Sequence, residues 1–520
     1  MLFSIIKKIE TVPIKTLSLI IVVLAMLITT QIQYIQHGWI NPDSVLYLEA
    51  AKLFATGEWK GGFGVFPWPL YSLCIAATHT LTTLSIHHSA QLLSVIFFGI
   101  ASASFIKIIT LAGGKQRQIL AGALILLSAQ YLMGGALEML MRDQGFWAFF
   151  LLSLVFFVQF YKKPQLIDAF FWQICIIIAM LFRIEAIAYL LLLPIILLFN
   201  KKHNLSSRLV NLIKCNFLNI ALGIAIIGFL LASPQAASQF LGRLNEVFNA
   251  NIISELTKIF TQKSSIMASQ VLGDYLEEFA VPGLLLTFIY VMIMKAVLAT
   301  GLVNITLAGF AIKARQHLID KETYRVLRAT AIIAIFNMAL IITKVFVLSS
   351  RYVLALSLVL MIFAAFYLAD LFKHLASNNS GNKKKWLVTA LLLFMALGLV
   401  KNILPKQPGY NHMQDAVAWV KTDNIVNKPV FYDDTRAKYY AEEPFAGTWP
   451  DNWAKVADAI NDKSIWQYDY LIINQSSKQP EKQLWLNEQL LPQYEKLKTF
   501  YDAKAKKYTL VYKKRGVSQP

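Results

Sequence analysis

Four charged side chains stand out because each lies near the end of a long apolar segment. They are Asp43, Asp143, Arg183 and Arg351. A carboxylate in such a place can take a proton from a hydroxyl group, and an arginine can hold a phosphate through two parallel hydrogen bonds. Ionisable groups at the ends of membrane spans are costly, which favours a functional role. The function of these four side chains depends on the structure of the segments that carry them.

The composition indicates a membrane protein. The chain has 520 residues, of which 57% are hydrophobic and 15% charged, and its mean hydropathy is +0.52. Soluble domains carry about 25% charged and 45–50% apolar residues, so a soluble enzyme, a disordered chain and a disulfide scaffold are excluded. The three cysteines are scattered in apolar runs and predict neither disulfides nor a metal cluster.

Apolar runs of roughly 17–25 residues can cross a bilayer. The first is too long for a signal-peptide core and lacks a cleavage site, so we interpret it as a retained span. About eleven such runs are expected, at 17–36, 89–110, 118–137, 144–161, 166–182, 186–199, 215–232, 296–312, 329–348, 352–372 and 386–401.

The distribution of Lys and Arg predicts the orientation. With the N-terminus inside, 21 of the 32 basic residues before position 402 fall in inner loops, as the positive-inside rule requires. The net charge of +19 is therefore a topology signal, and we expect no nucleic-acid partner. An odd number of spans places the C-terminal tail outside.

The chain divides into a transmembrane domain, 1–401, and a tail domain, 402–520. The tail alternates short helical and strand patterns and contains no long apolar run, which predicts a small α/β domain. Expected helices cover 414–422, 435–441 and 484–491, and expected strands cover 428–434, 469–475 and 507–514.

The first outer loop, 37–88, is too polar to span a membrane but carries helix signals. An amphipathic surface helix is expected to start around Asn41, Pro42 and Asp43. A second, apolar helix is expected after Pro67 and Pro69. We expect both to lie along the outer membrane surface.

The motifs of this loop resemble those of the membrane-integral GT-C glycosyltransferases, especially the protein O-mannosyltransferase and lipid A aminoarabinose transferase branch. The matching residues are Asp43, Tyr47, Ala51, Gly57, Trp59, Pro67, Pro69, Leu70 and Tyr71. The segments EMLMRDQGFWAFF, FRIEAIAYLLLLP and SSRYVLALSLVL are similar to later motifs of that superfamily. Their order and their common outer position make the resemblance more specific than any one motif.

The resemblance implies a GT-C-like fold and transfer of a sugar from a polyprenyl phosphate to an extracytoplasmic acceptor, which is a lipid-linked glycan, lipopolysaccharide or lipid A, or a protein. It implies Asp43 as the general base of an inverting reaction and Asp143 as a second carboxylate. The implied location is a bacterial inner (plasma) membrane. No cofactor is expected, and no essential metal, since Asp43 is followed by Ser44 and not by a second acid. Substrate-binding residues are expected at Tyr47, Lys60, Trp68, Arg142, Arg183, Glu185, Lys344, Arg351 and Tyr352.

Each candidate also has a structural interpretation. Asp43 is suited to cap its helix, and Arg142 can neutralise Asp143. Arg183 and Glu185 can simply pair with each other. Arg351 can anchor its span at the interface, where arginine and tyrosine are common.

Three other functions remain open. A lipid-linked sugar transporter or flippase suits the many spans with few charges, although the charged residues gather at one face and no inverted repeat is visible. A glycan ligase would need similar arginines. A non-catalytic assembly factor is the third alternative.

Overall fold

The computed structural model describes residues 10–232, 252–314, 318–376, 382–404, 411–445, 447 and 452–515. Contacts divide the chain into two compact units. The helical unit comprises 1–32, 91–138 and 142–403. The tail unit comprises 33–90, 139–141 and 404–520. The tail unit thus joins the expected first outer loop to the expected C-terminal domain.

Eight helices among the described residues are long and apolar enough to cross a membrane. This confirms the expectation of a mostly helical chain and suggests an integral membrane protein, although about eleven spans were expected. They are α2 (Ile14–Tyr34), α6 (Ile86–Leu111), α8 (Asp143–Lys162), α11 (Leu205–Ala232), α15 (Ala280–Thr300), α17 (Lys321–Val345), α18 (Leu354–Ala376) and α19 (Asn382–Ile403).

Shorter elements fill the space between these helices. Two of the expected spans are short: α9 (Leu166–Phe182), and α10 (Ala186–Leu192) continued by the 3-10 helix η2 (Leu193–Phe199). The expected span 118–137 is also interrupted. Its helix α7 (Gln116–Ser128) ends early, and a π-helical turn, η1 (Leu132–Ala136), follows. The remaining elements of this unit are α14 (Ile252–Ile266), the turns η4 (Met267–Leu272) and η5 (Glu277–Phe279), α16 (Leu302–Ala314) and η7 (Ser350–Val353).

The expected span 296–312 is wrong, because two helices meet inside it. The helix α15 ends at Thr300, Gly301 has a φ of +85°, and α16 starts at Leu302. A residue with positive φ ends a right-handed helix, and glycine adopts that conformation without a steric penalty. Hydropathy does not detect such a break, since both sides are apolar. As a result the long helix α15 was not expected.

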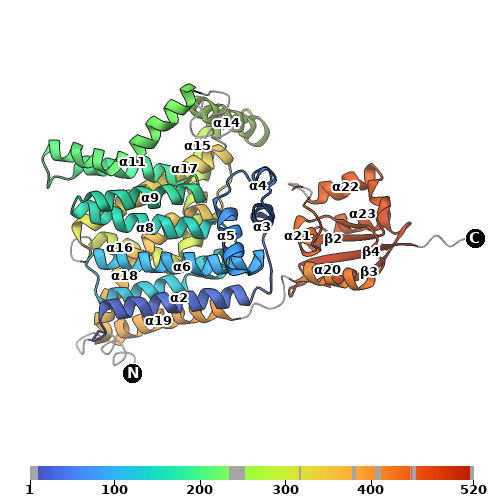
Figure 1. Cartoon of the computed structure of the whole chain (residues 1–520), viewed down its shortest axis with the longest axis horizontal. Coiled ribbons are helices and arrows are strands. Elements are labelled where there is room, and N and C mark those ends of the chain that lie inside the picture. Colours follow the sequence, from blue (N-terminus) through green and yellow to red (C-terminus); the bar gives the residue numbers. More distant parts are fainter. Residues whose placement is uncertain are drawn as a thin grey trace, which may run out of the picture. The chain divides into compact units, whose positions relative to one another are not determined.

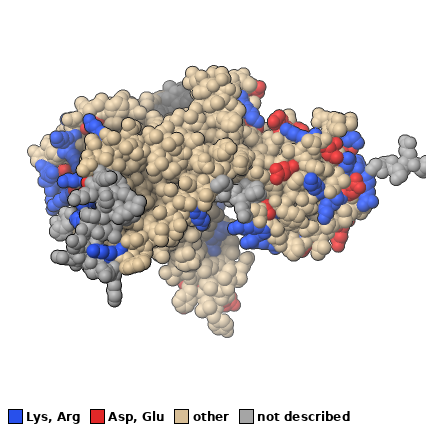
Figure 2. Space-filling model, turned by 90° about the horizontal axis from the view of Figure 1, so that it is seen from below, with Lys and Arg blue, Asp and Glu red and all other residues tan. Residues whose placement is uncertain are grey.

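The interior of the helical unit is built around α8 and α18. The helix α8 packs against α9, and α18 packs against α7 and α16 (Figure 1). By contrast, α11, α15 and α19 leave most of their apolar surface exposed, which suits helices that face lipid. Figure 2 shows a broad face of this unit almost without charge, with basic residues gathered toward one end.

Three helices form the N-terminal part of the tail unit: α3 (Pro42–Ala55), α4 (Trp59–Val65) and α5 (Leu70–Thr82). The first and third confirm the two expected helices of the first outer loop, and α4 was not expected. The helix α3 packs against both α4 and α5.

The C-terminal part is a four-stranded mixed sheet with helices, which confirms the expected α/β tail. The strands are β1 (Val430–Tyr432), β2 (Tyr470–Ser476), β3 (Tyr494–Tyr501) and β4 (Lys507–Lys514), in the order β1-β2-β4-β3. Only the β1–β2 pair is parallel. The helices are α20 (His412–Asp423), α21 (Thr435–Tyr440), α22 (Asn452–Asn461) and α23 (Pro480–Leu490), with the 3-10 turn η8 (Ser464–Gln467). The sequence patterns predicted all of these except β3, α22 and η8.

Side chains of β2 alternate between the two faces of the sheet, as strand geometry requires. Leu471 and Ile473 join one buried cluster with Leu486 and Leu490 of α23. Ile472 joins a second cluster, which contains apolar residues of α20. The sheet therefore has a hydrophobic core on each face.

Candidate functional site

The helical unit contains a buried ionic cluster centred on Arg183. This residue follows α9, is 4% exposed, and forms an ion pair with Asp143, which is 1% exposed at the start of α8. Its Nη2 donates to Glu185 Oε1 at 2.8 Å and its Nε donates to Glu185 Oε2 at 3.2 Å. One guanidinium group thus holds two carboxylates in fixed positions.

Tyrosines and a second arginine extend this cluster. The Arg183 guanidinium lies over the Tyr352 ring, 4.4 Å from its centroid, in a cation–π contact. The Tyr131 hydroxyl pairs with Ser350 and lies within electrostatic range of Asp143, Arg183 and Arg351. The turn η7 therefore brings Arg351 and Tyr352 to the same region as Arg183.

Tyr131 also lines an apolar cavity of about 280 Å³. Its wall comes from the segment after α7, from the junction of α15 and α16 at Gly301, and from α19. At Gly398 of α19 a Cβ atom would lie 3.2 Å from the Ser128 carbonyl oxygen, so the close approach there favours glycine. This apolar cavity therefore lies next to the charged cluster, and Tyr131 adjoins both.

Asp43 lies in the tail unit, in the first turn of α3, and is half-buried. The alternative that Asp43 caps this helix is wrong. Asn41 is the capping residue, and its Oδ1 accepts a hydrogen bond from the Ser44 backbone N–H at 2.9 Å. A carboxylate in the first turn remains well placed, because the helix dipole stabilises negative charge there.

The start of α3 is also tied to the segment 139–141 of the same unit. The Ser44 hydroxyl donates to the Leu140 carbonyl oxygen at 2.9 Å, and Asn41 Nδ2 lies 3.7 Å from Met139 Sδ. In the sequence this segment leads directly into Arg142 and Asp143. These contacts hold the start of α3 against residues 139–141.

The three other predicted residues of the first loop occupy different environments. Tyr47 is buried in edge-on contact with Phe66 and Tyr71, at ring centroid distances of 4.9 and 5.4 Å. Trp68 is 6% exposed, whereas Lys60 is exposed on α4. Tyr47 and Trp68 contribute to packing, and the role predicted for them in sugar binding stays a prediction.

The remaining candidates lie in the helical unit. Asp143 forms its ion pair with Arg183 of the segment after α9. Arg142 is half-buried and within electrostatic range of Glu185. Asn337 of α17 donates to the Glu185 carbonyl oxygen at 2.9 Å. Lys344 lies seven residues, about two turns, further along the same face of α17.

Sequence reasoning missed Tyr131. Tyrosine is common near span ends, and only its contacts with Ser350 and the cavity distinguish it. Glu138, which is 5% exposed just after the π-helical turn, was also missed, although a buried carboxylate near a span end is unusual.

Among the described residues, no group of three His, Cys, Asp or Glu side chains is arranged to hold a metal ion. The comparisons with known proteins add no assignment, because no family model matches the chain and no curated protein matches it significantly.

Proposed function

We propose that this protein is a glycosyltransferase that moves a sugar from a polyprenyl phosphate to an extracytoplasmic acceptor. One observation carries the proposal: the buried Asp143–Arg183–Glu185 cluster and Arg351 lie around Tyr131, which also lines an apolar cavity. A substrate with a charged phosphate and an apolar chain matches that combination. The resemblance to GT-C enzymes supports the same class of donor.

In this proposal the apolar cavity receives part of the polyprenyl chain, and Arg351 binds the phosphate. Arg183 already donates to two carboxylates, so we assign it the role of fixing Asp143 and Glu185 beside the donor. Fixed cations stabilise the charge that develops on the leaving phosphate. The phosphate leaves without protonation, so the mechanism requires no general acid.

Asp43 acts as the general base in this mechanism. It takes the proton from an acceptor hydroxyl as the hydroxyl oxygen forms a bond to the anomeric carbon of the sugar. The bond from that carbon to the phosphate oxygen breaks, and the polyprenyl phosphate leaves with the electron pair. A single displacement of this kind inverts the anomeric configuration.

The test is a transfer assay with the full chain in lipid nanodiscs. A panel of polyprenyl-phosphate sugars labelled with ³H in the sugar is incubated with total envelope glycolipids and proteins. We expect label to move to an acceptor and free polyprenyl phosphate to appear in equal amount. Movement of the labelled lipid across a vesicle membrane without any new covalent product would replace the proposal with the flippase alternative. Transfer of a whole glycan from a lipid pyrophosphate, with no use of single-sugar donors, would favour a ligase.

A further inference from the structure

The tail unit contains a cavity of about 650 Å³ where its two parallel strands end. The strands β1 and β2 are parallel, so their carboxyl ends meet at the same edge of the sheet. Asp433 and Asp434 follow β1, and Asn474 and Gln475 lie near the end of β2. All four line the cavity. Ligands commonly bind outside the carboxyl ends of parallel strands, and the volume is within the usual range for small-molecule sites.

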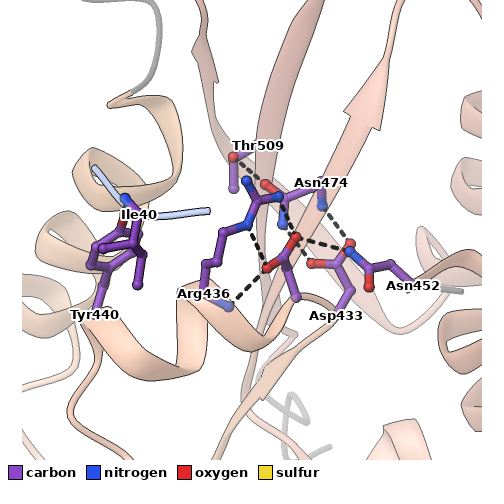
Figure 3. Close-up of polar contacts among 8 residues, drawn as sticks. Ile40, Asp433, Arg436, Tyr440, Asn452, Asn474 and Thr509 are labelled. Atoms are coloured by element: carbon purple, nitrogen blue, oxygen red, sulfur yellow. Dashed lines mark hydrogen bonds and ion pairs between the residues drawn. The ribbon is translucent and has the colours of Figure 1, made fainter. Parts of the chain in front are cut away.

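A connected hydrogen-bond network fixes the first part of the cavity wall (Figure 3). The Asn474 backbone N–H donates to Asp433 Oδ2 at 2.8 Å, and Asn474 Nδ2 donates to Asp433 Oδ1 at 2.6 Å. The Thr509 hydroxyl donates to Asn474 Oδ1 at 2.7 Å. Because Asp433 is only 1% exposed, these bonds hold its carboxyl group in one orientation.

Asp434 lies at the centre of the second part of the cavity wall. Arg436 donates to its two carboxylate oxygens at 3.0 Å from Nε and 2.6 Å from Nη2 (Figure 3). Asn452 Nδ2 donates to Oδ2 at 2.9 Å. The wall is thus made of planar carboxyl, carboxamide and guanidinium groups in fixed positions. Such groups present several donors and acceptors side by side, which matches the adjacent hydroxyl groups of a sugar.

The charge of the cavity favours a ligand without a phosphate. Its ionisable residues include Asp433, Asp434, Asp502, Arg436, Lys482 and Lys507. Burial raises the pKa of Asp433 to about 8, and Asp434 neutralises Arg436 through two hydrogen bonds, so these six residues carry at most about one net positive charge at neutral pH. A site for a phosphate or nucleotide would carry a larger basic excess or a glycine-rich loop, and the tail sequence has no such loop.

Two tryptophans supply an apolar surface beside these polar groups. Trp39 and Trp453 line the cavity and are half-buried. Trp453 makes a T-shaped contact with Trp485, with the ring centroids 5.3 Å apart, and Lys482 Nζ lies 4.9 Å from the Trp453 ring centroid. Tryptophan combines a large apolar face with a polar N–H group, so it packs well against the C–H face of a pyranose ring.

We propose that this cavity binds one sugar unit of a neutral glycan. The site uses planar polar side chains for the hydroxyl groups and tryptophan for the ring face. Trp39 lies four residues before Asp43 in the sequence, so the bound sugar would belong to the acceptor. That assignment as acceptor rests on the proposed transferase function, whereas sugar binding does not.

Binding can be measured by saturation-transfer difference NMR on the full chain in lipid nanodiscs. The probes are the methyl glycosides of glucose, galactose, mannose and N-acetylglucosamine. We expect saturable binding of at least one glycoside with a Kd in the millimolar range. Trp453→Ala and the exposed Gln479→Ala change the cavity wall without removing buried charge, and each should weaken binding about tenfold or more. Trp386→Ala, at an exposed position of α19, is the matched control and should bind like the unmodified chain.

The proposal is overturned if no glycoside signal exceeds that of empty nanodiscs, or if both cavity variants bind normally. Displacement of the glycoside by inorganic phosphate would also overturn it, since that result would show an anion site. The transfer assay separates the two proposals. Glycoside binding without sugar transfer would support the cavity and reject the transferase, whereas full transfer by a Trp453→Ala chain that binds no glycoside would reject the assignment of the bound sugar to the acceptor.

Discussion

The Tyr440 hydroxyl accepts a hydrogen bond from the Ile40 backbone N–H at 3.0 Å (Figure 3). These residues are 400 positions apart in the chain, yet Ile40 immediately precedes the cap of α3. The preceding residue of α21 strengthens the link, because Lys52 Nζ lies 4.6 Å from the Tyr439 ring centroid. The C-terminal α/β part therefore holds the helix that carries Asp43. The assignment of Asp43 as the base can be tested by changing Tyr440, which positions the helix, and by changing Asp43 itself.

Tyr440→Phe should loosen the start of α3. It leaves the fully buried Ile40 N–H without its partner, which costs about 1–3 kcal/mol. Hydrogen–deuterium exchange of the peptide covering 37–46 should speed up, and sugar transfer should fall. The matched control is Tyr439→Phe, which makes the same chemical change one residue away and keeps the ring beneath Lys52. Equal exchange rates in the two variants would count against a positioning role for Tyr440.

Asp43→Asn should reduce sugar transfer about 10²–10⁴-fold, the usual contribution of a general base. The substitution keeps the shape of the side chain, and Asn41 continues to cap α3, so the thermal midpoint should change little. Glu58→Gln removes a carboxylate from an exposed position in the same loop and should leave transfer unchanged. Full activity of Asp43→Asn would show that the base assignment is wrong.

Removing Arg183 should destabilise the protein more than removing Asp143. Arg183→Gln leaves two carboxylates without their shared cation, whereas Asp143→Asn leaves Arg183 paired with Glu185. Breaking a buried pair typically costs about 3–5 kcal/mol. The measurement is the fraction of monodisperse protein that survives a heating series. The half-exposed Lys373–Asp370 pair provides the control, since Asp370→Asn should cost less than about 1 kcal/mol. If Asp143→Asn destabilised the protein more than Arg183→Gln, Arg183 would not be the cation that both carboxylates share.

Arg351→Ala should raise the KM for the polyprenyl-phosphate donor about tenfold or more, with a smaller change in kcat. Arg351→Lys should recover only part of this loss, because lysine cannot make two parallel bonds to a phosphate. Lys163→Ala removes an exposed positive charge just after the end of α8 opposite to Asp143 and should leave the KM unchanged. An unaltered KM in Arg351→Ala would remove this residue from the donor site.

The tail unit should lose stability as the pH rises from 5 to 8. Burial, and then the neighbouring Asp434 charge, raise the pKa of Asp433 to about 8. The folded state therefore binds more protons than the unfolded state between the ordinary aspartate pKa and pH 8, so stability falls with rising pH in that window. Burial also lowers the pKa of Lys455 to about 8, which affects stability only above that pH.

Differential scanning fluorimetry of the full chain from pH 5 to 8 measures this effect. Asp433→Asn should have a flatter pH profile than the unmodified chain, because it removes the group that titrates in the window. Glu488→Gln, at an exposed position of α23, should keep the original slope. Parallel profiles for the Asp433→Asn variant and the unmodified chain would contradict the assigned pKa.

The sequence by itself determined the class of protein and most local elements. Long apolar runs and the alternation in the tail depend on near neighbours in the chain, so hydropathy and periodicity predicted seven of the eight long apolar helices and three of the four strands. The break at Gly301 was not predicted, since the positive φ of this residue does not change the hydropathy of a uniformly apolar run.

Only the tertiary structure decided which side chains meet. Local spacing suggested that Asp43 caps its own helix, whereas Asn41 caps it. The ion-pair partner of Asp143 is Arg183, which lies 40 residues further along the chain. The pairing of Ile40 with Tyr440 and the cavity around Asp433 likewise depend on segments that are distant in the sequence. Such contacts form where packing brings helices and strands together, and packing depends on the whole chain.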